Sequence, residues 1–313
     1  MSRNRYPRLL GFLPLLGMTL ILGGCKWTLL NPKGQVGLDE RNLIITAALL
    51  MLLVVVPVIV MTFAFAWKYR ASNTSATYAP KWSHSTKIEI AIWLVPILII
   101  SALGYVTYKS TYALDPYRPL ESDVNPINIE VVALDWKWLF IYPDLGISTV
   151  NQIRFPEHTP LNFKITSDSV MNSFFIPALG GQIYAMAGMQ TSLHLIANQK
   201  AEMEGISANY SGAGFTGMKF KAISTSQADF DAWVSEVKAA PKQLDEAEYK
   251  TLSKQSKNNP VTLYSAYTPH LFQKIVDKYE GMKIGKPVKH EKKEAATTEG
   301  YDKSSDSTAG VEE

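Results

Sequence analysis

The stretch Leu43–Trp67, LIITAALLMLLVVVPVIVMTFAFAW, decides how this chain is built. It runs for 25 residues without a charged side chain, and about 20 apolar residues are enough to cross the hydrocarbon core of a bilayer. A second apolar run, Ile88–Tyr108, follows and is interrupted only by Glu89 near its start. The sequence therefore predicts two transmembrane helices, at 43–67 and 88–108.

The charges around these runs predict their orientation. The loop 68–87 contains no acidic residue and four basic ones, Lys68, Arg70, Lys81 and Lys87. Short loops with an excess of Lys and Arg stay in the cytoplasm. The flanking segments 25–42 and 109–124 carry both signs of charge, so we expect both, and everything after them, on the outer side of the membrane.

The first 24 residues have the features of an export signal. Three arginines precede the apolar run 9–22, and residues 1–24 contain no acidic side chain. The apolar run is too short to span a bilayer, as is usual for an export signal. The segment ends in Leu22-Gly23-Gly24-Cys25, which resembles a bacterial lipobox. We expect residues 1–24 to be removed and Cys25 to carry lipid, although an ordinary signal with a coincidental cysteine is the alternative. An outer, lipid-anchored N-terminus agrees with the orientation of the hairpin.

Composition excludes several other classes of protein. The chain has 313 residues and one cysteine, which excludes an internal disulfide, a four-cysteine zinc site and a two-cysteine copper centre. Its net charge of +3 equals the three arginines of the export signal, Arg3, Arg5 and Arg8. The remainder has no basic excess of the kind that binds phosphates, so we expect no nucleic-acid partner.

The exported part begins with strand-like sequence. Apolar and polar residues alternate at 127–131, 161–165 and 218–223, and the segment 136–142 is rich in aromatic residues and stops at a proline. Several short strands divided by glycine and proline turns are typical of a β-sandwich or barrel. We therefore predict a linker at 109–124 and an all-β domain at 125–225.

The sequence after this domain predicts helices and then a disordered tail. Ser226 is a candidate N-cap for a helix that places Phe230, Trp233, Val234 and Val237 on one face. Two further helical stretches, at 244–252 and 270–279, complete a predicted extension over 226–282. Residues 283–313 contain too few apolar side chains to fold and are predicted to be disordered.

Six passages carry a family resemblance: Asn31–Gln35 (NPKGQ), Phe65–Asn73 (FAWKYRASN), Asp135–Trp138 (DWKW), Asn172–Pro177 (NSFFIP), Gln182–Thr191 (QIYAMAGMQT) and Tyr210–Phe215 (YSGAGF). Together with the lipoprotein signal and the hairpin, they resemble subunit II of the haem–copper terminal oxidases, in the branch of the cytochrome bo-type ubiquinol oxidases. The resemblance covers roughly residues 20–280. It implies a cupredoxin fold for the exported β-domain.

The resemblance also implies where the chain works and with what. Haems, copper and ubiquinol are expected on a partner, oxidase subunit I, and further small membrane subunits are expected beside it. The chain would be a multi-pass protein of the bacterial inner membrane, with its C-terminal domain in the periplasm. Cytochrome c is not expected as a partner.

In the relatives that oxidise cytochrome c, this domain holds a dinuclear copper centre. Its ligands are a histidine before one strand and a Cys-x-Glu-x-Cys-x3-His-x2-Met loop. The matching positions here are Asn172 for the first histidine, then Ser207, Asn209, Ser211, Phe215 and Met218. Thiolates and imidazoles suit copper, whereas a hydroxyl is a poor ligand and a phenyl ring is none. We therefore expect no metal and no cofactor on this chain, and we expect Met218 to pack in the core.

Three further residues are candidates for a role. Glu89 stands at the cytoplasmic end of the second helix, and the resemblance places it at the mouth of a proton channel that leads into subunit I. The alternative is a solvated carboxylate beside Lys87. Trp136 and Trp138 correspond to an aromatic patch, and without a metal behind them we expect them to pack internally or to contact a neighbouring subunit.

These observations predict a membrane protein with a two-helix transmembrane hairpin, an exported all-β cupredoxin-like domain and C-terminal helices. Its expected function is that of a non-redox subunit of a proton-pumping ubiquinol oxidase, with structural and proton-uptake roles and no catalytic residue of its own. The alternative is an envelope lipoprotein whose metal-free cupredoxin-like domain binds a ligand or scaffolds an assembly.

Overall fold

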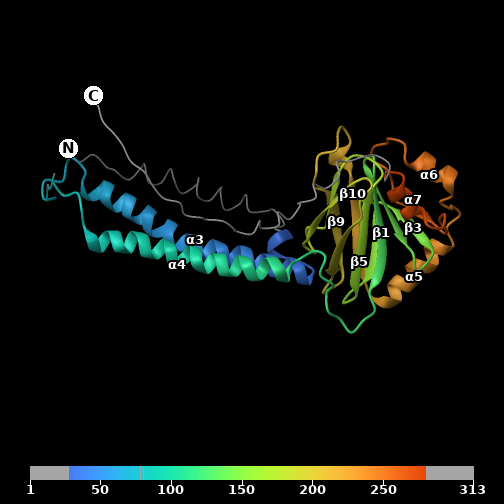
Figure 1. Ribbon diagram of the computed structural model, residues 1–313, viewed down its shortest axis with the longest axis horizontal. Coiled ribbons are helices and arrows are strands. Elements are labelled where there is room, and N and C mark those ends of the chain that lie inside the picture. Colours follow the sequence, from blue (N-terminus) through green and yellow to red (C-terminus); the bar gives the residue numbers. More distant parts are fainter. Residues whose placement is uncertain (1–27, 78, 80, 280–313) are drawn as a thin grey trace, which may run out of the picture. The chain divides into compact units, whose positions relative to one another are not determined.

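The computed structural model describes residues 28–77, 79 and 81–279 (Figure 1). The predicted export signal, Cys25 with its predicted lipid and the predicted tail at 283–313 lie outside the described residues. After a short 3-10 turn, η1 (Thr28–Leu30), two long helices follow, α3 (Gln35–Lys68) and α4 (Thr86–Ala113). Both are long and apolar enough to cross a membrane.

Helix α3 starts eight residues before its apolar run because its first turns belong to the β-domain. Val36 and Gly37 are buried there, and the amide of Gly37 donates to the carbonyl of Leu179 at 2.9 Å. Gly34 forms an isolated antiparallel bridge with Ala197. The polar start of α3 is thus fixed by contacts made 140 or more residues further along the chain.

The β-domain has two sheets. One has the strand order β11-β3-β2-β1-β5-β8, and the other has the order β4-β10-β9-β6-β7. The strands predicted at 127–131, 136–142, 161–165 and 218–223 are confirmed as β1, β2, β5 and β10. The strands are β1 (Ile127–Leu134), β2 (Lys137–Tyr142), β3 (Ile147–Val150), β4 (Gln152–Pro156), β5 (Pro160–Ser167), β6 (Asn172–Phe175), β7 (Gln182–Ala185), β8 (Thr191–Ile196), β9 (Ala201–Ser207), β10 (Lys219–Thr225) and β11 (Thr262–Tyr264).

Aromatic side chains fill the space between the sheets. The rings of Phe174 and Phe220 stack at 5.2 Å and 10°, and Trp138 meets both rings edge-on. Alternate residues of β2, Leu139 and Ile141, point to a second apolar cluster on the other face of the same sheet. Strand β2 is buried throughout because both of its faces are covered, and this explains why its sequence is apolar without alternation.

The second cluster is covered by the C-terminal elements α6 (Glu246–Leu252), β11 and α7 (Leu271–Asp277), whereas α5 (Gln227–Lys238) packs its apolar face against the first cluster. Ser226 caps α5 by accepting from the amide of Asp229 at 3.2 Å. The four side chains predicted to lie on one face of α5 are all buried, so that prediction is confirmed. The two later helices are confirmed with shorter bounds. Strand β11 was not predicted, since three residues are too few to show a periodicity.

The predicted fold class is confirmed. Two long apolar helices lead into a two-sheet β-domain, and helices follow it.

Candidate functional site: three loops at one end of the β-domain

The residues that stand at the copper positions gather at one end of the β-domain. Strand β6 begins there with Asn172, and the neighbouring antiparallel strand β9 ends there with Ser207. The loop 208–214 and the 3-10 turn η2 (Phe215–Gly217) then lead into β10. The contacts of α3 with Leu179 and Ala197 lie at the other ends of β6 and β8, so the two features occupy opposite ends of these strands.

The polar side chains at these positions hydrogen-bond to one another and to the backbone. Asn172 is fully buried; its Nδ2 donates to the carbonyl of Val170 at 2.9 Å, and its Oδ1 accepts from the hydroxyl of Ser207 at 3.1 Å. Asn209 donates its Nδ2 to the carbonyl of Met171 at 2.9 Å. The site is therefore a closed hydrogen-bond network that ties the loop before β6 to the loop after β9.

The remaining positions offer little to a metal. Met218 is buried in the apolar core, and Phe215 packs its ring edge-on against Tyr210, with 5.7 Å between the centroids. The hydroxyl of Ser211 is buried and lacks a hydrogen-bond partner. Across residues 28–77, 79 and 81–279, no group of three or more His, Cys, Asp or Glu side chains could hold a metal ion.

Trp136 is part of this site, and Trp138 is not. The indole of Trp136 donates from Nε1 to the carbonyl of Ser211 at 3.0 Å, and its ring lies so close to Gly214 that a Cβ there would stand 2.2 Å from it. The ammonium of Lys257 lies 5.6 Å from the ring centroid. Trp138 has no exposed surface and packs in the core, because it lies on a strand covered on both faces. Of the two tryptophans, only Trp136 keeps surface with which another subunit could make contact.

Two long stretches of the chain that form loops at this end carry no charged side chain. The sequence contains no Asp, Glu, Lys, Arg or His from Ser169 to Leu193 or from Gly205 to Met218. Protein interfaces are depleted in charge and enriched in Tyr and Met, and exposed apolar patches mark such sites. The surface, which we call the uncharged end, exposes five large side chains: Val170, Met171, Tyr184, Met189 and Tyr210.

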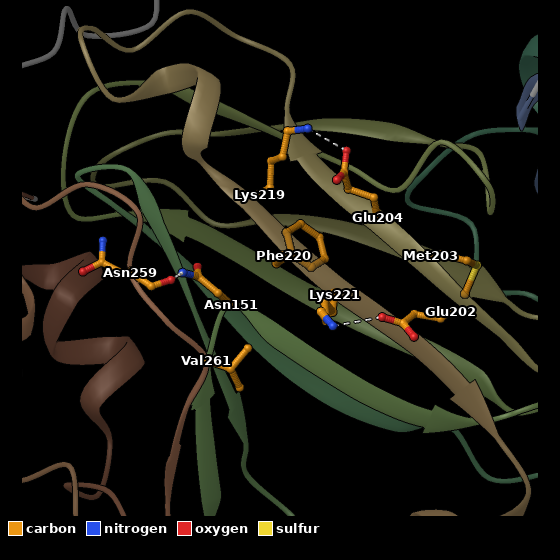
Figure 2. Close-up of a pocket in the computed structure, with 9 residues that line it drawn as sticks. All are labelled: Asn151, Glu202, Met203, Glu204, Lys219, Phe220, Lys221, Asn259 and Val261. Atoms are coloured by element: carbon orange, nitrogen blue, oxygen red, sulfur yellow. Dashed lines mark hydrogen bonds and ion pairs between the residues drawn. The ribbon is translucent and has the colours of Figure 1, made fainter. Parts of the chain in front are cut away.

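The open groove in Figure 2 has a different character. It has a volume of about 610 Å³ and lies over β9 and β10 beside the segment that contains Asn259. Its four charged side chains neutralise one another, since Lys219 pairs with Glu204 at 2.9 Å and Lys221 with Glu202 at 3.1 Å. The groove offers a ligand no uncompensated charge from these four residues.

Glu89 lies in the first turn of α4 and has a partner that the sequence analysis did not identify. Its Oε1 lies 2.6 Å from Nδ1 of His84, and the other ring nitrogen, Nε2, is 3.3 Å from the hydroxyl of Thr86. Both side chains of the pair are exposed. An imidazole in contact with a carboxylate can pass a proton to it. The only available signal was a histidine five residues before the glutamate in the same loop.

Comparison with known proteins gives three findings. Residues 238–283 match the family described as COX Aromatic Rich Motif. "Cytochrome bo(3) ubiquinol oxidase subunit 2" of Pseudomonas putida is 68% identical over 315 residues and covers all of both chains. "Ubiquinol oxidase subunit 2" of Acetobacter aceti is 54% identical over 274 residues, which are 87% of this chain and 89% of that protein. The chain belongs to the family of ubiquinol oxidase subunit 2.

A solved structure was also matched, the periplasmic domain of subunit II of cytochrome oxidase from Bradyrhizobium japonicum. It is 19% identical, covers 38% of this chain and 96% of that one, and has a TM-score of 0.36. Membership of the ubiquinol oxidase family confirms the resemblance that the six sequence passages indicated. The family also implies a catalytic subunit I as partner and fits an inner-membrane protein. The described part of the matched segment, residues 238–279, begins at the last residue of α5 and contains α6, β11 and α7; we call residues 238–279 the arm.

Proposed function

We propose that this chain is the non-redox subunit II of a proton-pumping ubiquinol oxidase. Haems, copper and ubiquinol then belong to the catalytic subunit I, and further small subunits complete the complex. The chain crosses the inner membrane twice, with its β-domain in the periplasm and lipid on Cys25. It supports the catalytic subunit structurally and helps protons to reach it.

One observation supports the proposal that this chain has no redox centre. At the positions where copper-binding relatives have thiolates and imidazoles, this chain has amides and hydroxyls that are already bonded to each other, as in the pair Asn172 and Ser207. Such groups are poor ligands for copper, and the phenyl ring of Phe215 cannot coordinate a metal. These residues do not fit a copper centre, so no electron-transfer step is assigned to this chain.

The experiment is to purify the complex by a tag on this chain and to measure haem, copper and oxygen uptake with ubiquinol. We expect haem, copper and quinol-dependent respiration in the complex, and no copper on this chain after the subunits are separated. Copper bound to the separated chain would refute the non-redox assignment. Isolation of the chain alone in mild detergent, without haem, would favour the second candidate, an envelope lipoprotein with a metal-free binding or scaffolding domain.

The uncharged end supports a structural role. Exposed Tyr and Met side chains on loops that carry no charge of their own fit a protein partner better than an electron donor that is recognised through complementary charges. We assign this surface to contact with the catalytic subunit.

The proton-uptake role rests on Glu89 and its position. The basic loop 68–87 supports a cytoplasmic position for the start of α4, and carboxylates within membrane spans often mark proton or ion paths. The contact with His84 adds a second proton-exchanging group at the same point. Glu89 then collects protons at the mouth of a channel that leads into the catalytic subunit.

The change Glu89→Gln tests this role, because an amide keeps the shape of the side chain and loses its proton chemistry. We expect turnover with ubiquinol to fall several-fold while haem content and assembly stay unchanged. Lys81→Gln is the matched control, since it removes a charge from the same loop without a contact to Glu89. Unchanged turnover in Glu89→Gln, or an equal loss in the control, would remove the proposed role.

A further inference from the structure

The carboxylate of Asp168 is buried at the end of β5, directly before the loop that leads to Asn172. Only 1% of its side chain is exposed. Tyr249 donates its hydroxyl to Oδ2 at 2.6 Å, while Lys278 and Tyr279 donate to Oδ1 at 2.7 and 2.8 Å. A buried carboxylate is costly unless it is paired and hydrogen-bonded, and these three donors meet both conditions.

All three donors come from the arm, although they lie far apart within it. Tyr249 is in α6, whereas Lys278 and Tyr279 directly follow α7. The hydrogen bond to Asp168 raises the pKa of Lys278, and burial together with the same carboxylate raises the pKa of Tyr249. The lysine therefore stays charged and the phenol stays protonated at neutral pH. The arm thus reaches one carboxylate from two separate points of its length.

The neighbouring residue, Ser167, makes hydrogen bonds that extend into the loop before β6. The hydroxyl of Ser167 accepts from the amide of Ser169 at 3.1 Å and donates to the carbonyl of Val170 at 2.9 Å. The same carbonyl accepts from Asn172 at 2.9 Å. The position of Asp168 is thereby linked to the network that joins this loop to the loop after β9.

The arm also touches the other two loops of the uncharged end. In the loop between β7 and β8, a Cβ at Gly188 would stand 2.9 Å from the Cβ of Tyr279. At the loop after β9, Lys257 of the arm covers the ring of Trp136, which in turn closes on Gly214. The arm therefore contacts all three loops. It hydrogen-bonds to Asp168 at the loop before β6, packs against the loop between β7 and β8, and covers Trp136, which packs on the loop after β9.

We propose that the arm holds the three loops of the uncharged end in one conformation, and that Asp168 is the positioning residue through which it acts. Covering the outer face of the six-stranded sheet requires only apolar packing, which the second cluster already supplies. The carboxylate of Asp168 is buried although Lys278 is 58% exposed, and a buried charge costs free energy that apolar residues in its place would not, so stability alone does not call for this carboxylate. Hydrogen bonds are directional, so the bonds from the arm to Asp168 fix the position of the loop before β6.

The test is hydrogen–deuterium exchange in the intact complex, with two amides as reporters. The amide of Ala208 donates to Ser173 at 3.0 Å in one loop, and that of Met189 donates to Met186 at 3.3 Å in another. In Asp168→Asn we expect exchange at both reporters to rise about tenfold or more, the scale of a lost hydrogen bond to a charged group.

Two further variants make the result decisive. Tyr249→Phe removes one hydroxyl that donates to the Asp168 carboxylate and keeps the packing of the ring. It should raise exchange at the two reporter amides by a smaller factor than Asp168→Asn, and it serves as the test if Asp168→Asn fails to assemble. Glu246→Gln breaks the exposed pair with Lys274 on the same arm and should change neither reporter. Unchanged exchange at the reporters in both test variants would overturn the proposal, as would an equal rise at the amide of Gly37 at the opposite end of the domain.

Discussion

The glycine at position 214 gives the sharpest test of how this loop is built. Its backbone angles, φ −105° and ψ 2°, are open to alanine, so Gly214→Ala introduces no backbone strain. The added Cβ would instead stand 2.2 to 2.5 Å from three ring carbons of Trp136. Contacts between carbon atoms need about 3.5 Å, so the indole or the loop must move by more than 1 Å.

The magnitude follows from what that movement breaks. Overpacking of a well-filled site costs about 1–3 kcal/mol. Displacing the indole also endangers its hydrogen bond to the carbonyl of Ser211, which contributes about 1 kcal/mol. We expect Gly214→Ala to lower the free energy of local opening by about 2–4 kcal/mol, so that exchange rates rise at least about thirtyfold.

The assay is hydrogen–deuterium exchange at the amide of Phe215, which donates to the carbonyl of Gly212 at 3.1 Å in the folded loop. Ala213→Ser is the matched control, because it changes the exposed neighbouring residue without approaching the indole. If Gly214→Ala exchanged at the native rate while Ala213→Ser did the same, the tight fit between loop and indole would be refuted.

Two further predictions concern buried polar groups. Asn172→Ala removes one acceptor and one donor from the loop network, so the free energy of opening at the Ala208 amide should fall by about 2 kcal/mol, measured by exchange. Lys137 is fully buried and donates to the carbonyl of Lys254 at 2.8 Å; burial lowers its pKa below the ordinary 10.5, against the smaller opposing effect of Asp135. The folded chain then releases this proton at lower pH than the unfolded chain, so stability should rise as the pH climbs from the lowered pKa toward 10.5. Lys137→Met should lose that rise, as judged by thermal inactivation at several pH values, and a rise retained by the variant would count against this origin.

Much of the fold could be predicted from the sequence, because the spacing of apolar residues and the placement of charges reflect which side chains are buried and which face water. The helix α5 was predicted from its cap at Ser226 and its apolar face, and β1 from strict alternation. The uncharged end is also readable as two long runs without a charge, although only the structure shows that the runs converge. The bounds of α3 were not predictable, since its polar first turns are helical through a contact with Leu179, far along the chain.

The sequence predicted which residues stand at the site, but not the hydrogen bonds that connect them. The resemblance to a family with copper-binding members marked Asn172 and Ser207, but their mutual hydrogen bond depends on the register of β6 with β9. Asp168 gave no signal, because a single acid before a loop resembles any surface residue until the arm is seen to close on it. His84 and Glu89 were separated by a helix boundary that sequence patterns locate only to within a few residues.

The contacts at the start of α3 have a consequence for the order of events during biogenesis. Gly181 donates its amide to the carboxylate of Glu40 at 3.0 Å, across a sequence separation of 141 residues. Helix α3 is thus synthesised long before the strands that contact its first turns. In the topology proposed above, the β-domain cannot complete its fold on the N-terminal side until β6 and β8 have crossed the membrane, nor on the C-terminal side until Tyr279 has followed. Folding of the exported domain is therefore a late event, and a truncated translation product would be left with an open sandwich and exposed apolar strands.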